Sequence, residues 1–410
     1  MRLPRSAGGK GRREADEANK PAEVEAIEAF LFSQAEFRHN VITHHCEIRW
    51  TEEAGFLPLT DRDVNTLWGR MNKTVGRVYL TDIYNVIHSE FVPLFNPFQS
   101  YFDHLPSWDG VSDPIGDLAD TVHVKSDQAE FRDYFRKWFV GILPALLDDT
   151  VVNHEILVLI GEQGLYKTTW FNFLLPPELR CYFYTKTNSD RLNKDDLFSL
   201  TEFALICFEE LDGMRPAELN QLKAMVTMPY VNERAAYGRN KERHPHIASF
   251  CGTGNNVQFL TDPTGNRRWL PFEVSQIRDP HLHAIPYELV YSQAYALWKS
   301  GFCHWFSQEE IRKLNMHNSR FEVPNLEEDL IRTHFRKPFE GEAGIFVTAA
   351  DILEQISSCL RYPLSPNKIG RIMAGLEFES IRYKGKRGYI AVKKTGEDID
   401  RERRSGALGL

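Results

Sequence analysis

A run of five apolar residues, Ile156–Ile160, leads into the sequence Gly161-Glu-Gln-Gly-Leu-Tyr-Lys-Thr-Thr. A buried strand, a glycine-containing loop and a helix that starts near a lysine are typical of a phosphate-binding loop (P-loop). Lys167 can reach the β- and γ-phosphates of a nucleoside triphosphate, and Thr168 can give its hydroxyl to Mg²⁺. Backbone N–H groups around the helix start can hold the phosphates. The residues that we predict to contact the nucleotide are Gly161, Gln163, Gly164, Tyr166, Lys167, Thr168 and Thr169.

One position departs from the P-loop pattern. The residue before the lysine is usually glycine, whereas this chain has Tyr166. A residue with a Cβ adopts positive φ less readily than glycine, so we expect Gly164 to supply the flexibility of the loop. The alternative is an ordinary strand–loop–helix connection, but the complete strand and helix around the loop favour nucleotide binding.

Length and composition indicate a cytoplasmic protein of two or three domains. The chain has 410 residues, which is long for a single core. It has no run of about 18 apolar residues and no signal-peptide pattern near Met1, so we expect no contact with a membrane. Its six cysteines form no C-x-x-C pair, which argues against a disulfide framework or a zinc ribbon.

The charge of the chain is unevenly distributed. A formal net charge of −8 opposes binding of a polyanion by the whole molecule. Between Arg361 and Lys394, however, nine Lys and Arg residues accompany two acids, a local net charge of +7. Nucleic acid therefore remains a candidate partner for this segment.

The predicted fold is an α/β P-loop NTPase core with a helical N-terminal domain and a C-terminal winged-helix-like α+β domain. Strands and helices alternate in the core, as expected of a parallel sheet. The predicted core elements are strand 156–160, helix 167–175, strand 203–208, helix 216–226 and strand 247–251. The predicted segments are a disordered tail (1–20), a mostly helical N-terminal domain (21–150), the ATPase domain (151–300), a linker helix (301–329), the winged-helix-like domain (330–394) and a tail (395–410).

Polar side chains follow two further apolar runs of the core. The run 203–208 ends in Glu209 and Glu210, which would lie beside the P-loop at the carboxyl edge of a parallel sheet. One carboxylate would join Thr168 near Mg²⁺ and the other would orient the attacking water. Spacing does not decide between them; we favour Glu210 as the base and Glu209 nearer the metal. After strand 247–251, the amide of Asn255 can sense the γ-phosphate, and the small residues before it allow close approach.

Two adjacent arginines, Arg267 and Arg268, lie in a segment rich in turn residues. A guanidinium group delivered across a subunit boundary suits the charge that develops on a transferring phosphoryl group. The alternative is an arginine pair on an ordinary surface.

Several segments together resemble the virulence-associated protein E (VapE-like) family. They are the P-loop sequence, Glu210-Leu-Asp212, Tyr237-Gly-Arg239, Gly252-Thr-Gly-Asn255 and Asp262-Pro-Thr-Gly-Asn-Arg-Arg268. The resemblance is strong over about residues 95–275. This family comprises P-loop ATPases similar to superfamily-three helicases and to the helicase part of phage and plasmid primase–helicases.

The resemblance implies a replication ATPase of a mobile element that uses ATP and Mg²⁺ and assembles as a homo-oligomeric ring. Lys167 and Thr168 correspond to Walker A, Glu210 to Walker B and Asn255 to the sensor, while Arg267 or Arg268 corresponds to an arginine finger acting on the next subunit.

Two features depart from the family's relatives. Cys207 stands where many relatives have an acid, which would weaken catalysis unless Glu209 compensates. Many relatives also carry a primase domain, but residues 1–150 show no metal motif for one, so a separate primase would supply priming.

Two segments are candidates for contact with DNA, which we expect to be single-stranded. One is the basic segment between helix 216–226 and strand 247–251, which would project into the pore of a ring; its alternative is a solvated hairpin. The other has two capped helices, 348–355 and 365–376, followed by a hairpin with a cationic turn, 381–392, which is the pattern of a winged helix. A winged helix used for protein contacts is the alternative. The predicted contacts are Arg234, Tyr237, Arg239, Lys241, Lys368, Arg371, Lys384, Lys386 and Arg387.

The sequence favours a nucleic-acid-stimulated ATPase or DNA helicase. A DNA-binding replication or regulatory factor that uses ATP as an assembly switch without unwinding is the alternative. A metabolite kinase would leave the arginine pair and both basic segments without a role.

Overall fold

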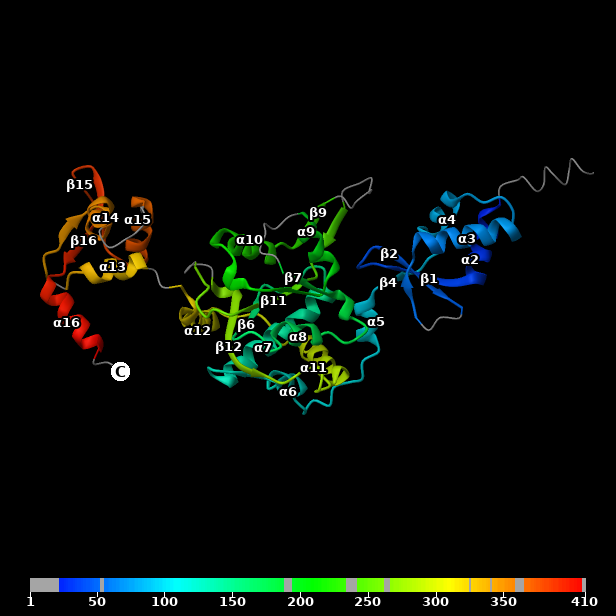
Figure 1. Cartoon of the computed structure of the whole chain (residues 1–410), viewed down its shortest axis with the longest axis horizontal. Helices are drawn as coiled ribbons and strands as arrows, with labels where there is room; N and C mark the ends of the chain where they lie inside the picture. The colour runs from blue at the N-terminus through cyan, green and yellow to red at the C-terminus, as the bar shows by residue number, and fades with distance from the viewer. Residues whose placement is uncertain are drawn as a thin grey trace, which may run out of the picture. The chain divides into compact units, whose positions relative to one another are not determined.

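The computed structural model describes residues 22–51, 55–187, 194–233, 242–261, 266–323, 326–339, 341–357 and 365–407. The chain divides into two compact units, Met1–Phe321 and Glu322–Leu410 (Figure 1). Both units combine helices with strands, so the fold is mixed α/β. No helix in these described ranges has both the length and the apolar character that crossing a membrane requires.

A six-stranded sheet forms the centre of the first unit. Its spatial order is β5-β12-β6-β11-β8-β7, in which β5 is antiparallel to β12 and the other five strands run parallel. The strands are β5 (Val122–Val124), β6 (Ile156–Ile160), β7 (Phe183–Lys186), β8 (Leu205–Phe208), β11 (Ser249–Gly254) and β12 (Trp269–Ile277). The central position of β6 explains its uninterrupted apolar sequence, since both of its faces are buried.

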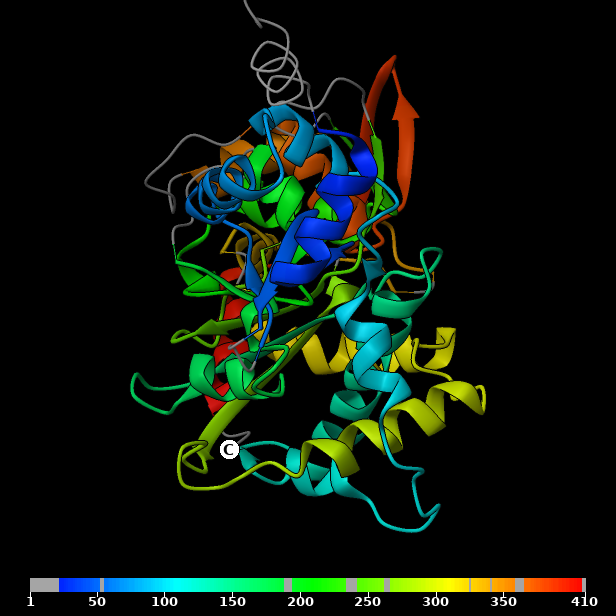
Figure 2. The same ribbon diagram turned by 90° about the vertical axis from the view of Figure 1, so that its right-hand side faces the viewer.

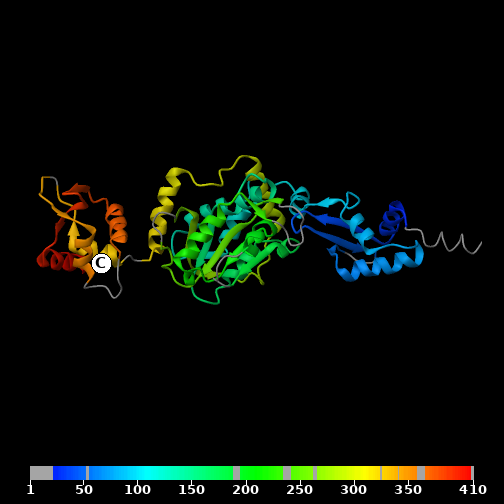
Figure 3. The same ribbon diagram turned by 90° about the horizontal axis from the view of Figure 1, so that it is seen from above.

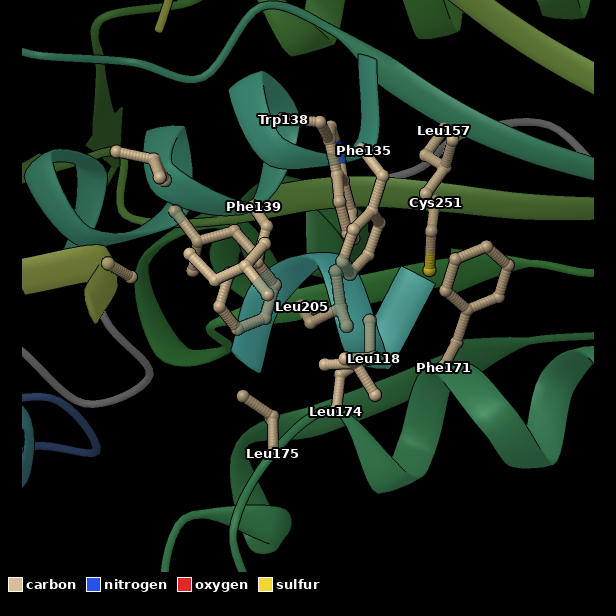
Figure 4. Close-up of a cluster of buried hydrophobic side chains, with 14 of the residues drawn as sticks. Leu118, Phe135, Trp138, Phe139, Leu157, Phe171, Leu174, Leu175, Leu205 and Cys251 are labelled. Atoms are coloured by element: carbon tan, nitrogen blue, oxygen red, sulfur yellow. The ribbon is translucent and has the colours of Figure 1, made fainter. Parts of the chain in front are cut away.

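Helices cover both faces of this sheet (Figure 3). Alternate strand residues point to two separate hydrophobic clusters: Leu157 and Leu159 join one, and Ile156, Val158 and Ile160 join the other. The first face is covered by α7 (Gln128–Leu147), α8 (Lys167–Phe173) and α11 (Tyr287–Lys299), and the second by α9 (Lys194–Glu202) and α10 (Pro216–Val226). Figure 4 shows aromatic side chains of α7 packed with residues of the strands and of α8.

Most of the core elements predicted from the sequence are present in the structure. Strand 156–160 and helix 216–226 have the expected bounds. The strand expected at 203–208 begins two residues later, and the strand expected at 247–251 begins two residues later and ends three residues later. Strands β7 and β12 and helix α9 were not expected. Strand β7 has only four residues, and β12 contains Pro271, which lowers its strand propensity.

The expected helical domain of residues 21–150 is divided differently in the structure. Most buried apolar residues up to Val92 form a hydrophobic cluster of their own, whereas Ile42 and the residues from Phe98 share the cluster of the central sheet. The reason is that α7 buries Phe135, Trp138 and Phe139 completely against that sheet. The helices before α7 in this shared part are α5 (Pro97–Asp103) and α6 (Pro114–Ala119).

The N-terminal part is also less helical than expected, because it contains a four-stranded sheet of order β3-β2-β1-β4. Its hairpin pairs Ala35 with Trp50 and Asn40 with His45. Its elements are α2 (Val24–Gln34), β1 (Ala35–Asn40), β2 (His45–Trp50), β3 (Leu57–Pro58), α3 (Asp61–Thr74), α4 (Leu80–Ile87) and β4 (Leu94–Phe95).

Helix α12 (Gln308–Asn318) is not a linker, contrary to our expectation for residues 301–329. It packs on the central sheet, where the buried His317 ring lies 2.6 Å from the carbonyl oxygen of Pro271 through Nε2. The other ring nitrogen, Nδ1, lies 2.8 Å from a carboxylate oxygen of Glu130 on α7. These polar contacts at a buried position fasten the helix to the core.

The second unit contains a helical pair followed by a β-hairpin, as the sequence predicted. Ser365 caps the second helix and Pro366 begins it. The hairpin turns through Lys384 and Gly385, both with positive φ (48° and 78°), and its ribbon is visible in orange-red in Figure 2. The elements are α13 (Leu326–His334), β13 (Phe335–Arg336), β14 (Ile345–Val347), α14 (Ala349–Ser357), α15 (Pro366–Gly375), β15 (Ser380–Tyr383), β16 (Lys386–Lys393) and α16 (Gly396–Ala407).

The segment expected to be a C-terminal tail contains helix α16. Its start is fixed by reciprocal hydrogen bonds: the Thr395 hydroxyl accepts from the Asp398 N–H, and the Asp398 carboxylate accepts from the Thr395 N–H. This Thr-x-x-Asp arrangement is a capping box, a start signal that the sequence analysis missed.

We predict that Glu130→Gln lowers the stability of the first unit most strongly near neutral pH. The hydrogen bond with His317 is the main influence that lowers the pKa of Glu130. A lowered carboxyl pKa stabilises the fold above the ordinary carboxyl pKa, and this contribution is lost as the pH falls through the lowered value. The free energy of unfolding of the variant should therefore be roughly 1–3 kcal/mol lower than that of the wild type at pH 7. It should also change less as the pH falls into the acid range.

Urea unfolding followed by tryptophan fluorescence between pH 3 and pH 7 would measure this. Glu309→Gln, which alters an exposed carboxylate on α12, is the matched control. Parallel pH profiles for Glu130→Gln and the wild type would contradict the assignment.

Candidate functional site

The loop between β6 and α8, residues 161–166, packs closely against the neighbouring strands β11 and β12. The N–H of Gly161 donates to the carbonyl oxygen of Gly254 at 3.1 Å, which joins the loop to the end of β11. A Cβ atom at Gly161 would lie 2.8 Å from the carbonyl oxygen of Val274. Glycine is therefore required at Gly161 by the close approach of two neighbouring strands.

Tyr166 adopts the left-handed backbone conformation, with φ 60° and ψ 18°. Our expectation that Gly164 supplies the flexibility of the loop is incomplete, because Gly164 (φ 88°) and Tyr166 both have positive φ. The reason is that the chain must turn at Tyr166, whose carbonyl accepts from the Trp170 N–H at 2.7 Å and so begins α8. Conformational strain is thus concentrated at the start of the helix.

Lys167 is a buried cation held inside the loop that precedes it. Its ammonium donates to the carbonyl oxygens of Gly161 and Glu162, both at 2.7 Å, and lies 3.4 Å from Oδ1 of Asn255. Burial lowers the pKa of Lys167, and the nearby Asp212 carboxylate opposes this shift. The charge is held where the loop would surround phosphate groups.

Thr168 and Glu209 meet on the other side of the site. The Thr168 hydroxyl donates to Oε1 of Glu209 at 2.8 Å. A hydroxyl and a carboxylate at this separation are hard oxygen donors of the kind that Mg²⁺ binds, so these residues fit the predicted metal. The neighbouring Glu210 has positive φ (54°) and precedes the short 3₁₀ helix η2 (Leu211–Gly213).

These side chains line one cavity of about 460 Å³. The structure brings together all the residues predicted to bind nucleotide or metal or to activate water, except Gly161 and the arginine pair. The lining residues are Gln163, Gly164, Leu165, Tyr166, Lys167, Thr168, Thr169, Glu209, Glu210, Thr253 and Asn255. Their specific roles remain predictions.

Asp212 is a residue of the site to which the sequence analysis assigned no role. Its carboxylate accepts from the N–H groups of Asn255 (3.2 Å) and Asn256 (3.0 Å), and so fixes the loop that carries the predicted sensor. A Cβ at Gly254 would lie 3.0 Å from Asp212, and one at Gly252 would lie 2.2 Å from a methyl carbon of Leu211. The expected close approach beside Asn255 is therefore confirmed. The signal in the sequence was a third carboxylate two residues after Glu210, in the segment that follows β8.

Cys207 lies inside the core and not in the cavity. It is completely buried, and in the register of the neighbouring strands β8 and β11 it lies beside Cys251. Both cysteines are free thiols. The carboxylate next to Thr168 belongs to Glu209, two residues later. A carboxylate is thus available near the expected metal position without an acid at position 207.

Arg267 and Arg268 lie at the opposite edge of the sheet from the cavity. They belong to the short helix η3 (Asn266–Arg268), directly before Trp269, which pairs with Ile156 at the start of β6. The five residues of β6 separate this edge from the Lys167 loop by about 16 Å. The arginines therefore lie far from the cavity of their own chain. The preceding motif residues, 262–265, lie outside the described residues.

The predicted nucleic-acid residues fall into three groups. Arg234, Tyr237, Arg239 and Lys241 lie between β9 (Tyr230–Glu233) and β10 (Glu242–Pro245), outside the described residues. Lys368 forms an ion pair with the buried Glu327, which gives this lysine a structural partner. The remaining predicted contacts, which are exposed side chains of the second unit, are Arg371, Lys384, Lys386 and Arg387.

The first unit is therefore an α/β protein in which a strand–loop–helix segment and two neighbouring strand ends form one polar cavity. Residues 103–323, more than half of the chain, match the family model of the virulence-associated protein E-like domain. The chain belongs to this family. No curated protein matches the sequence.

Solved structures of the NrS-1 C-terminal region are similar to this chain over much of its length. An apo structure is 12% identical with a TM-score of 0.47, and two A form apo structures are 12% and 11% identical with TM-scores of 0.45 and 0.49. Each match covers 90% of this chain and 99% of the other.

We predict that Tyr166→Gly increases the free energy of unfolding by roughly 1 kcal/mol, because glycine adopts the left-handed conformation without the clash of a Cβ. Tyr166→Ala keeps the Cβ and should give no such gain. Urea unfolding of the three proteins would measure the difference. A glycine variant no more stable than the alanine variant would show that the backbone conformation at Tyr166 is not strained.

Proposed function

We propose that this protein is a nucleic-acid-stimulated ATPase, most specifically a DNA helicase or translocase that serves replication of a phage, plasmid or other mobile element. The main support is the convergence of Lys167, Thr168, Glu209, Glu210 and Asn255 on one cavity. They come from the ends of β6, β8 and β11, which are neighbours in the sheet. Membership of the virulence-associated protein E-like family agrees with this proposal.

In the proposed reaction, a water attacks the γ-phosphorus of ATP in line with the bond to the leaving ADP oxygen. Glu210 accepts the proton of that water, and Asn255 positions it from the neighbouring strand. Lys167 and backbone N–H groups at the start of α8 stabilise the negative charge of the phosphates. Thr168 and Glu209 would hold Mg²⁺, which neutralises charge on the phosphate oxygens when bound.

The position of the arginine pair supports a site completed by a second copy of the chain. Arg267 and Arg268 lie at the edge of the sheet opposite the Lys167 loop of their own chain. In a homo-oligomeric ring, each subunit can present this edge to the nucleotide of its neighbour, where a guanidinium stabilises the charge of the transferring phosphoryl group.

DNA is the proposed partner, and the second unit offers a cationic hairpin for it. The proposal of a winged helix is supported by the order of α13, β14, α14, α15 and the β15–β16 hairpin. Its exposed turn carries Lys384, Lys386 and Arg387, which suit contacts with phosphates. Priming would come from a separate primase.

An assembly factor that binds ATP without unwinding DNA is a second candidate. Tyr166 favours it, because a strained side-chain-bearing residue replaces the usual glycine beside the phosphates. Such a protein would bind ATP and assemble, but DNA would not accelerate its turnover.

The first test is steady-state ATP hydrolysis with and without single-stranded DNA, with oligomer mass measured in the same samples. We expect DNA to stimulate hydrolysis by ring-sized assemblies of the wild type. Lys167→Ala should reduce turnover by at least about 100-fold, because it removes the cation that contacts the phosphates. Tight ATP binding without DNA-stimulated turnover would reject the translocase and support the assembly factor.

A second prediction concerns the cationic hairpin. Replacing Lys384, Lys386 and Arg387 by alanine should weaken DNA binding and reduce the slope of log K against log salt by up to about 3, since each phosphate contact contributes roughly 0.7–0.9. Fluorescence anisotropy at several salt concentrations measures both quantities. Lys337→Ala, an exposed cation outside the hairpin, is the control. An unchanged slope in the triple variant would remove the hairpin from the DNA interface.

A further inference from the structure

The segment that carries Arg267 and Arg268 is held at its base by the end of helix α12. The side-chain amide of Asn318 donates to the carbonyl oxygens of Asn266 at 2.8 Å and Trp269 at 3.0 Å. These two carbonyls lie immediately before and after the arginine pair. A single amide group therefore closes the short backbone turn on which both guanidinium groups are mounted.

The same end of α12 also holds the chain where it enters this segment. The carbonyl oxygen of Phe321, in the 3₁₀ helix η4 (Ser319–Phe321), accepts from the N–H groups of Phe259 and Leu260, both at 3.0 Å. Two residues only three positions apart in the sequence, Asn318 and Phe321, thus bind the backbone at residues 259–260 and at residues 266 and 269.

The end of α12 is itself immobilised in the core. Asn318 is completely buried, and the neighbouring His317 contacts both the Pro271 carbonyl and the Glu130 carboxylate. Strand β5 pairs with β12 only from Val274 onward, so it does not reach the carbonyl groups of Trp269 and Pro271. Asn318 binds the first of these carbonyls and His317 contacts the second. The family match extends to residue 323 and therefore includes this helix end.

We propose that Asn318 is a positioning residue for Arg267 and Arg268, which sets their direction toward the nucleotide of a neighbouring copy. This inference rests on the proposed ATPase function. A long guanidinium side chain can act across a subunit boundary only if its backbone is fixed, because small displacements of a catalytic group reduce rates steeply. Asn318 supplies this rigidity through two hydrogen bonds and does not touch the nucleotide.

The test uses Asn318→Asp, which keeps the shape of the side chain but replaces the donating NH₂ by an oxygen that repels both carbonyls. When it is the only subunit present, the variant should bind a fluorescent ATP analogue and assemble like the wild type. Its kcat should be reduced about 10- to 100-fold, the range expected for residues that orient a functional group. Arg267→Ala and Arg268→Ala are measured in parallel.

Mixed assemblies separate positioning from general damage. Subunits with Asn318→Asp, co-expressed with Lys167→Ala subunits and purified through two tags, should regain hydrolysis, because intact arginines then face intact nucleotide sites. Mixing Asn318→Asp with the arginine variant that loses activity should restore nothing, since both lack a correctly placed guanidinium. A general folding defect would leave both mixtures inactive.

Several results would overturn the inference while the proposed function stands. The first is that Asn318→Asp has the kcat of the wild type although an arginine variant is inactive. The second is that Asn318→Asp stays inactive when mixed with Lys167→Ala subunits, although an arginine variant regains hydrolysis when mixed with the same subunits. A wild type without any ATP hydrolysis would instead reject the proposed function. If Asn318→Asp does not fold, Asn318→Ser retains one donor and should show a smaller loss with the same mixing pattern.

Discussion

The candidate site depends on the close backbone approach of β6 and β11 at the carboxyl edge of the sheet. The hydrogen bond from Gly161 to Gly254 joins the two strand ends, and neither position has room for an unhindered side chain. This contact places the Lys167 loop beside the loop of Asn255, and Asp212, in the helix η2 that follows β8, binds the backbone of the Asn255 loop. Three separate sequence segments become one cavity because parallel strands end at the same edge.

Two residues of the cavity adopt a backbone conformation that is unfavourable for their type. Tyr166 and Glu210 both have positive φ, and each stands where a strand end or loop turns sharply into a helix. Strain of this kind persists only where the surrounding structure determines the conformation. Here the buried β6 and β8 and the hydrogen bond that begins α8 provide that determination.

The same sheet also separates the functional groups. Its parallel register puts the cavity at one edge and the arginine pair at the other, so a single chain cannot unite them. Helix α8 begins at the edge that carries the cavity, and helix α12 ends at the edge that carries the arginine pair. Its buried amide and imidazole groups bind backbone carbonyls of β12, which makes a helix that resembled a linker part of the core.

The local features could be predicted from the amino-acid sequence: the strand 156–160, the loop that follows it, the helix 216–226 and the cationic hairpin of the second unit. Each depends on residues close together in the chain, such as apolar runs, capping residues and turn glycines. The packing of α7 and α12 on the sheet, the binding of Asp212 to the loop of Asn255 and the hydrogen bonds of Asn318 on both sides of the arginines became visible only in the folded chain. These arrangements arise from contacts between distant segments, and neither periodicity nor spacing specifies which buried polar group finds which backbone partner.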